Sequence, residues 1–185
     1  YTFDIVGDGK GDVTYSFAPN GVLLNQGQGW VQEGSNWYWV QEDGTRFTGS
    51  KADLVTYTAS SWNLINGKYY LFDENGVMQT GWKKVVNGNG EVKWYYMTGN
   101  GDCVLNSWVF VGNNWYLLNA SGEMVTGFAV RGGKTYLLNP TAAGITDDVI
   151  STSKYVPYGA MVTGAVSIKD ENGKYMEMVF DSNGA

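Results

Sequence analysis

Paired carboxylates are the first candidates for catalytic chemistry in this chain, because two acids held together can divide acid and base roles. Glu42-Asp43, Asp73-Glu74 and Asp170-Glu171 each lie directly before Gly or Asn-Gly. This equivalent placement predicts solvated turn residues that hydrogen-bond their own backbone. Asp147-Asp148 lies outside the pattern and is the pair that it does not explain.

Other catalytic and metal-binding side chains are scarce. Histidine is absent, which removes the commonest general base, the usual Ser-His or Cys-His pair and clusters of Cys and His around a metal. Cys103 is the only cysteine, so no internal disulfide can form. We therefore expect no catalytic residue, no metal site and no cofactor, in a protein that is not an enzyme.

Aspartates near the start of the chain suggest a calcium loop. DIVGDGKGD places Asp4, Asp8 and Asp12 four residues apart, with glycines between them. An EF-hand loop needs oxygen ligands at alternate positions and a distal Glu. Here Lys10 stands at a ligand position, and Pro19 stands where the distal Glu should be. We interpret the segment as a Gly-rich hairpin tip that leads into VTYSF.

Most of the remaining sequence repeats one aromatic cassette, whose clearest copy is WNLINGKYYLFDENGVMQTG at Trp62 to Gly81. The opening aromatics Trp62 and Trp82 are 20 residues apart, as are Trp108 and Phe128. Two insertions, 50–60 and 140–158, interrupt this period, and the first of them carries no turn signature of its own. Repetition at this spacing predicts stacked small units.

The units divide the chain into three stretches of a single array, 1–185. Residues 1–29 form a degenerate first repeat, 30–139 the core repeats, and 140–185 an insertion with degenerate last repeats. The incomplete copies at both ends indicate a piece of a longer array. The chain also starts without a signal peptide, which we attribute to a mature fragment.

Each cassette has the local chemistry of a β-hairpin. KYYLF, KWYYM, NWYLL and KTYLL are short, aromatic or apolar, and bounded by Gly, Asn or Asp, as strands are. The tips precede them at Asn66 and Gly112, and VVNGNGEVK predicts a longer hairpin tip. An isolated hairpin is marginally stable, so neighbouring hairpins must cover its apolar face. The sequence predicts an all-β solenoid of stacked hairpins of about 20 residues, with two insertions.

Charge and hydropathy exclude two classes of partner. The net charge is −6, and Lys and Arg do not cluster in the sequence, so we expect no nucleic-acid binding. No apolar run approaches the roughly 18 residues of a transmembrane helix.

The segments GWKKVVNGNGEVKWYYM, GVMQTGW and GEMVTGF carry a resemblance to a known family. They resemble the cell-wall-binding repeats of Gram-positive surface proteins, which include choline-binding repeats with the pattern GW, WYYL or WYYF, a Gly turn and M-x-T-G-W. The resemblance covers about Gly29 to Asn139. Glucan-binding repeats of glucansucrases and the long repeats of clostridial toxins share nearly the same cassette, so the ligand stays open.

This resemblance implies ligand pockets between consecutive repeats, each built from an opening Trp, a cluster aromatic and an aromatic of the following repeat. Such rings would hold a quaternary ammonium group by their negative faces. Carried onto this chain, the implied pockets are Trp82, Trp94 and Trp108 with Tyr96; Trp108, Trp115 and Phe128 near Met124; and Trp62, Tyr69 and Trp82 near Met78. The alternative role for any of these rings is core packing, because a solenoid of short repeats has little aliphatic core.

Three functions remain open. The favoured one is a non-catalytic attachment module, extracellular and associated with the cell surface or cell wall, that binds a cell-wall or surface polysaccharide bearing choline or another glycan. It would be joined to another domain in the full-length protein. The alternatives are a carbohydrate-binding module for extracellular glucan or host glycan, and a ligand-free spacer or self-association stalk.

Overall fold

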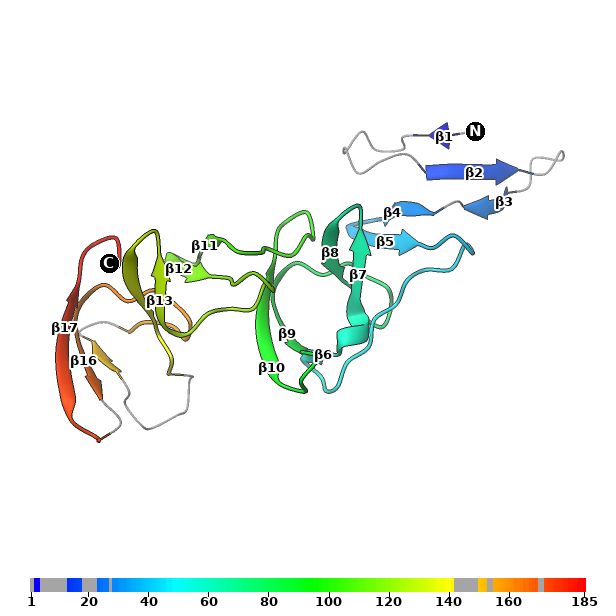
Figure 1. Cartoon of the computed structure of the whole chain (residues 1–185). Helices are drawn as coiled ribbons and strands as arrows, with labels where there is room; N and C mark the ends of the chain where they lie inside the picture. Colours follow the sequence, from blue (N-terminus) through cyan, green and yellow to red (C-terminus); the bar gives the residue numbers. More distant parts are fainter. Residues whose placement is uncertain are drawn as a thin grey trace. The chain divides into compact units, whose positions relative to one another are not determined.

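The computed structural model describes residues 28–141, 155–169 and 172–185 with their side chains, and residues 2–3, 13–17, 23–26 and 150–152 as backbone strands (Figure 1). The chain divides into two compact units, Tyr1–Cys103 and Val104–Ala185, which are described separately. The segment DIVGDGKGD, interpreted as a hairpin tip, and the pairs Asp147-Asp148 and Asp170-Glu171 lie outside the described residues.

Among the described residues of the first unit, the regular secondary structure consists of β-strands and one 3-10 turn. The strands form hairpins, β4 with β5 and β7 with β8, and the three-stranded sheets β1-β2-β3 and β10-β9-β6 (Figure 1). Their bounds are β1 (Thr2–Phe3), β2 (Val13–Phe17), β3 (Leu23–Gln26), β4 (Gly29–Glu33), β5 (Asn36–Val40), β6 (Thr56–Tyr57), η1 (Ala59–Ser61), β7 (Trp62–Ile65), β8 (Lys68–Leu71), β9 (Gly81–Val86) and β10 (Val92–Met97).

The second unit continues the same pattern. Its strands pair as β11 with β12, β13 with β14, and β15-β16-β17, and all these pairings are antiparallel. Their bounds are β11 (Trp108–Val111), β12 (Asn114–Leu117), β13 (Gly127–Arg131), β14 (Lys134–Leu138), β15 (Ile150–Thr152), β16 (Gly164–Lys169) and β17 (Tyr175–Phe180).

Tight turns close the short hairpins where the sequence predicts tips. Asn66 and Gly67 have φ of 49° and 78°, and Gly112 and Asn113 have φ of 55° and 65°. Positive φ at both central residues is the type I′ geometry, whose twist matches that of the flanking strands. The predicted long tip is also confirmed: Asn87 Oδ1 accepts the Glu91 N–H at 3.0 Å, between two six-residue strands.

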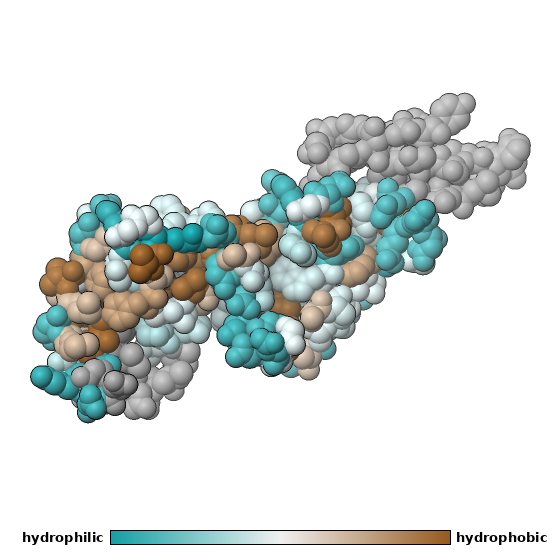
Figure 2. Space-filling model, viewed as in Figure 1, coloured by the Kyte–Doolittle hydropathy of each residue, from teal (hydrophilic) through white to brown (hydrophobic). Residues whose placement is uncertain are grey.

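The core is a row of side chains that recurs once per hairpin. Each row residue follows the aromatic cluster, is at most 1% exposed, and forms an antiparallel bridge with the residue after the next turn. Figure 2 shows that the outer surface mixes polar side chains with exposed apolar ones. The row and its bridge partners are Val40 with Arg46, Phe72 with Met78, Met97 with Cys103, Leu118 with Met124, and Leu138 with Met161.

The predicted carboxylate turns are confirmed for the two pairs that the structure describes. Asp73 Oδ1 accepts the N–H groups of Asn75 and Val77 at 2.9 and 2.8 Å, and Asp43 Oδ1 accepts the Thr45 N–H at 2.9 Å. Because these carboxylates stabilise their own turns, their pairing in the sequence reflects the repeat.

The first insertion contains a turn, although its sequence carries no turn signature. Asp53 Oδ1 accepts the N–H groups of Val55 and Thr56 at 2.8 and 2.7 Å, which closes a turn without Gly or Pro. The turn leads into β6, which pairs in parallel with β9. The insertion therefore adds an edge strand to the long hairpin.

Candidate functional site

In four hairpins the opening tryptophan lies diagonal to the first aromatic of the second strand, whereas β13–β14 has Thr135 at that position. The register explains this, because Trp108 faces Leu117 while Phe110 faces Trp115, so the two tryptophans are diagonal neighbours on one face. In three other hairpins the corresponding rings meet edge to face. The ring centroids and interplanar angles are Trp30–Trp37 at 6.4 Å and 84°, Trp62–Tyr69 at 6.5 Å and 82°, and Trp82–Trp94 at 6.4 Å and 86°.

A tyrosine from the following hairpin completes the arrangement. The second cluster residue points to the opposite sheet face from the first, because side chains alternate along a strand. It thus meets the opening aromatic of the preceding hairpin, again edge to face, as aromatic pairs prefer. These contacts are Trp30–Tyr70 at 4.8 Å and 66°, Trp62–Tyr95 at 5.1 Å and 72°, and Trp108–Tyr136 at 5.0 Å and 66°.

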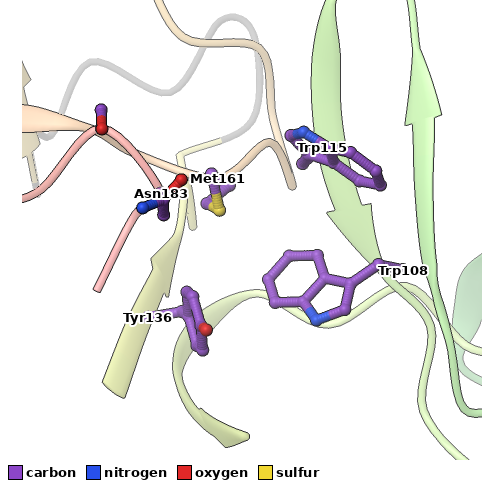
Figure 3. A pocket seen from close by; sticks show the side chains of 6 residues that line it. Trp108, Trp115, Tyr136, Met161 and Asn183 are labelled. Atoms are coloured by element: carbon purple, nitrogen blue, oxygen red, sulfur yellow. The ribbon is translucent and has the colours of Figure 1, made fainter. Parts of the chain in front are cut away.

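The side chains around Trp108 line an open cavity in the second unit. Its volume is about 310 Å³, and Trp115 is 44% exposed at its edge. Figure 3 shows Trp108, Trp115, Tyr136 and Met161 directed toward a common space. The lining residues, called the Trp108 cage below, are Trp108, Trp115, Tyr136, Met161, Ser182 and Asn183.

Backbone contacts fix Met161 within the Trp108 cage. Its N–H donates to the Trp115 carbonyl at 2.8 Å. Its thioether lies against Gly184, which has φ of 80°, and a β-carbon there would overlap Met161 Sδ. Glycine permits both the positive φ and this close approach. The methionine is therefore held against the cage by two separate constraints.

The C-terminal turn supplies the polar side of the Trp108 cage. Asp181 Oδ1 accepts the N–H groups of Asn183 and Ala185 at 2.8 and 3.0 Å. These hydrogen bonds lower the pKa of Asp181 and keep its carboxyl group ionised, and the bond from Ala185 has the larger effect. The turn thereby fixes the backbone that carries Ser182 and Asn183.

The composition of the Trp108 cage determines its chemistry. None of its six lining side chains is charged, and three are aromatic. Ring faces attract a cation that lies within about 6 Å of their centroids, and a thioether adds a polarizable apolar contact. Ser182 and Asn183 add hydrogen-bonding groups for a hydroxyl. The cage can thus hold an organic cation or the apolar face of a polyol.

The equivalent arrangement around Trp30 is filled by protein. Trp30, Tyr70 and Met78 are 6%, 7% and 8% exposed and pack with Trp39 and Phe72 in one cluster. The bulky Trp39 and Phe72 occupy space beside Trp30, so its rings serve as core. This site matches the core-packing alternative.

The arrangement around Trp62 is intermediate. Tyr69 is 43% exposed, whereas Tyr95 is buried against Trp62. Cys103 packs against the same cluster, and burial, with Asp102 as a smaller cause, raises its pKa to about 12. The thiol therefore stays neutral and acts as an apolar wall.

Family comparisons agree with this geometry. A model described as a choline-binding repeat matches residues 59–108, and one for a cell wall binding repeat matches residues 28–45 and 106–124. Residues 28–45 and 59–124 thus carry repeats of the cell-wall-binding type. The cell-wall-binding repeats matched here include the hairpin that carries Trp108 and Trp115.

Relatives with these repeats are much longer than this chain. Glucosyltransferase-S of Streptococcus mutans is 26% identical over 156 residues, which cover 80% of this chain and 9% of that protein. Glucosyltransferase-S of Streptococcus downei is 30% identical over 97 residues, which cover 52% of this chain and 6% of that protein.

A solved structure carries the same fold. Choline binding protein F of Streptococcus pneumoniae, determined in the presence of a peptidoglycan analogue, is 27% identical with a TM-score of 0.53, over 97% of this chain and 55% of that one. The predicted all-β solenoid of hairpin repeats is confirmed. No helix in the described residues is long and apolar enough to cross a membrane.

The structure brings some predicted site residues together and separates others. Trp108 and Trp115 line one cavity, but Tyr136 and Met161 take the places expected for Phe128 and Met124. Phe128 is 52% exposed, and Met124 lies against Gly159. Sequence reasoning missed Met161, Ser182 and Asn183, and it also missed Tyr136, although a tyrosine recurs at that cluster position in each hairpin from β5 to β14.

The other predicted groupings are rearranged similarly. Trp62 meets Tyr69 and Tyr95 rather than Trp82, and Met78 packs in the Trp30 cluster. Trp82 meets Trp94 and, at 5.1 Å, Tyr96. Trp108 belongs to the second unit, so a pocket that joins it to Trp82 stays a prediction.

Proposed function

We propose that this chain is a non-catalytic attachment module that binds cell-wall or surface glycopolymer, and that the Trp108 cage takes a choline-type quaternary ammonium group. The carrying observation is a cavity walled by Trp108, Trp115, Tyr136 and Met161, with no charged side chain among the described residues that line it. A quaternary ammonium cannot donate a hydrogen bond, so ring faces are its natural partners.

The relatives support attachment as the role. The chain spans 9% and 6% of the two glucosyltransferases, so in such proteins the repeats accompany other domains. We propose the same arrangement here, with the repeats holding another domain at the cell surface or cell wall.

Glucan binding is the second candidate, and two observations favour it. Trp115 is 44% exposed and presents a ring at the cavity edge, while Ser182 and Asn183 supply hydrogen-bonding groups on the other side. The glucosyltransferase relatives are consistent with a sugar ligand. A sugar would stack on the ring and hydrogen-bond through its hydroxyls.

The test compares choline with its neutral isostere. Calorimetric titration of the full chain would use choline, 3,3-dimethylbutan-1-ol and maltotriose. We expect choline to bind about tenfold or more tightly than the isostere, because each ring contributes roughly 0.5 to 2 kcal/mol to cation binding. Binding of maltotriose alone would favour the glucan candidate, and silence with all three would favour a ligand-free spacer.

A pair of tyrosine variants locates the effect. Tyr136→Leu should weaken choline binding, whereas Tyr155→Leu should not, because Tyr155 is 85% exposed and lies outside the cavity. Equal loss in both variants, or none in either, would contradict the assignment.

A further inference from the structure

A second cavity lies in the first unit, against the β10-β9-β6 sheet, with a volume of about 430 Å³. Lys51, Lys83 and Lys84 line it together with Trp82 and Trp94. No acidic side chain is among the described residues that line it. In a chain of net charge −6, this concentration of lysines makes the cavity a distinct chemical site.

The insertion at residues 50–60 builds one wall of this lysine cavity. Parallel pairing places Thr56 opposite Lys84, which brings the insertion alongside β9. Leu54 and Val55, in the turn before β6, are 94% and 63% exposed and line the cavity. The wall thus offers an apolar surface that a ligand would cover.

The three ammonium groups are differently engaged. Lys51 forms an ion pair with Glu74 at 3.1 Å, and the Lys84 ammonium lies 5.0 Å from the Trp94 ring centroid. Burial, and then the neighbouring Lys51, lowers the pKa of Lys83. Neither Lys83 nor Lys84 has an ion-pair partner within 4.0 Å among the described residues.

The carboxylates of Asp53 and Asp73, near the lysine cavity, already accept hydrogen bonds from backbone N–H groups. Asp53 interacts with Lys84 electrostatically, but its Oδ1 accepts two N–H groups of its own turn. Asp73 is the acid that acts on Lys83, and its Oδ1 likewise accepts two turn N–H groups. These acids lie outside the cavity lining, so an incoming anion can engage the lysines directly.

Lys84 is particular to this hairpin. The residue that faces the first cluster position is Leu64 in β7, Phe110 in β11 and Val130 in β13. In β9 it is Lys84, which faces Trp94. An ammonium group already lies over this ring, and like charges repel, so a quaternary ammonium is disfavoured here.

We infer that the lysine cavity binds an anionic saccharide, meaning a sugar ring that carries a carboxylate or a phosphate. Lys84, on the sheet face of Trp82 and Trp94, would donate a charge-assisted hydrogen bond to the anionic group, and Lys83, whose side chain leaves the strand on the other face, would add positive potential. Trp82, Trp94 and Leu54 would pack against the apolar face of the sugar. This site lies in the first unit and takes a different ligand class, so it does not depend on the Trp108 cage.

The test is a calorimetric titration of the full chain at low salt with glucuronate, glucose 6-phosphate and glucose. We expect at least one charged sugar to bind about tenfold or more tightly than glucose, with affinity falling as NaCl is added. A preference for glucuronate identifies a carboxylate ligand, and a preference for glucose 6-phosphate identifies a phosphate. Equal affinity for all three sugars would overturn the inference.

Lysine variants assign the effect to this cavity. Lys84→Met should weaken binding of the charged sugar about tenfold, because it removes the charge-assisted contact, and Lys83→Met should weaken it less. Lys93→Met removes the same charge from β10 but outside the cavity, where Lys93 pairs with Glu91 at 3.2 Å, and should change affinity less than about twofold. Equal loss in all three would overturn the inference.

Choline separates this inference from the proposed function. Choline should not compete with the charged sugar, and Tyr136→Leu should leave sugar binding unchanged. Competition by choline would overturn the inference, whereas failure of choline to bind anywhere would contradict the Trp108 cage and leave the lysine cavity unaffected.

Discussion

Trp115→Ala should lower choline affinity without unfolding the protein. Trp115 lines the Trp108 cage but is 44% exposed, so its truncation exposes less apolar surface than removal of a buried tryptophan. Loss of one ring contact at roughly 0.5 to 2 kcal/mol corresponds to about a 2- to 30-fold weaker Kd. The stability cost should stay below the about 3 to 5 kcal/mol of a buried Trp→Ala change.

Phe128→Ala is the matched control for this prediction. Phe128 is 52% exposed on the next hairpin and does not line the cavity, although the sequence points to it. Calorimetric titration with choline measures affinity, and guanidinium unfolding measures stability. Unchanged binding in Trp115→Ala, or an equal loss in Phe128→Ala, would refute the structural assignment of the site.

Three further predictions concern stability and reactivity. Phe72→Ala should destabilise the protein by about 3 to 5 kcal/mol in guanidinium unfolding, because Phe72 is fully buried, whereas Leu64→Ala at a 57% exposed position should cost much less; similar costs would contradict the core row. Gly101→Ala should cost about 1 to 2 kcal/mol for a left-handed residue at φ 85° plus overlap with a methionine, whereas Gly99→Ala, with open space around it, should not; thermal unfolding of both variants tests this. Cys103 should alkylate far more slowly at pH 9 in the folded than in the urea-unfolded protein, since burial raises its pKa from 9.0 to about 12. The contribution of the neutral thiol to stability is accordingly present below pH 9 and lost as pH rises toward 12. Equal alkylation rates in the two states would show an exposed thiol.

The hairpins and their turns were predictable because their signals are local. Alternation within KYYLF and the Asn66-Gly67 tip determine which residues face together, since both depend on neighbours in sequence. The same alternation predicts that Trp108 and Trp115 share a face. One half of the Trp108 cage therefore follows directly from the cassette.

The other half depends on how hairpins stack. Tyr136 and Phe128 belong to the same following hairpin, and the repeat period does not tell which of them faces back toward Trp108. Phe128 pairs with Leu137, whereas Tyr136 pairs with Ala129, so the side chains of Phe128 and Tyr136 lie on opposite faces of the hairpin. Met161 was harder still, because the insertion at residues 140–158 separates it from the preceding cluster.

The lysine cavity could not be read from sequence order. Lys51 lies over 30 positions before Lys83 and Lys84, so the lysines do not form a run. The short parallel pairing between β6 and β9 brings them to one cavity. A two-residue strand within an insertion leaves no periodic signal, because alternation needs about four residues to be recognised.

The most direct test of the central claim follows methionine methyl groups by NMR while choline is added to protein labelled at its six methionines. The Trp108 cage predicts that the Met161 methyl shifts and saturates, because Met161 lines the cavity, while Met78, 8% exposed in the first unit, stays unchanged. A Met161 signal that does not move at saturating choline, or a shift confined to Met78, would contradict the account.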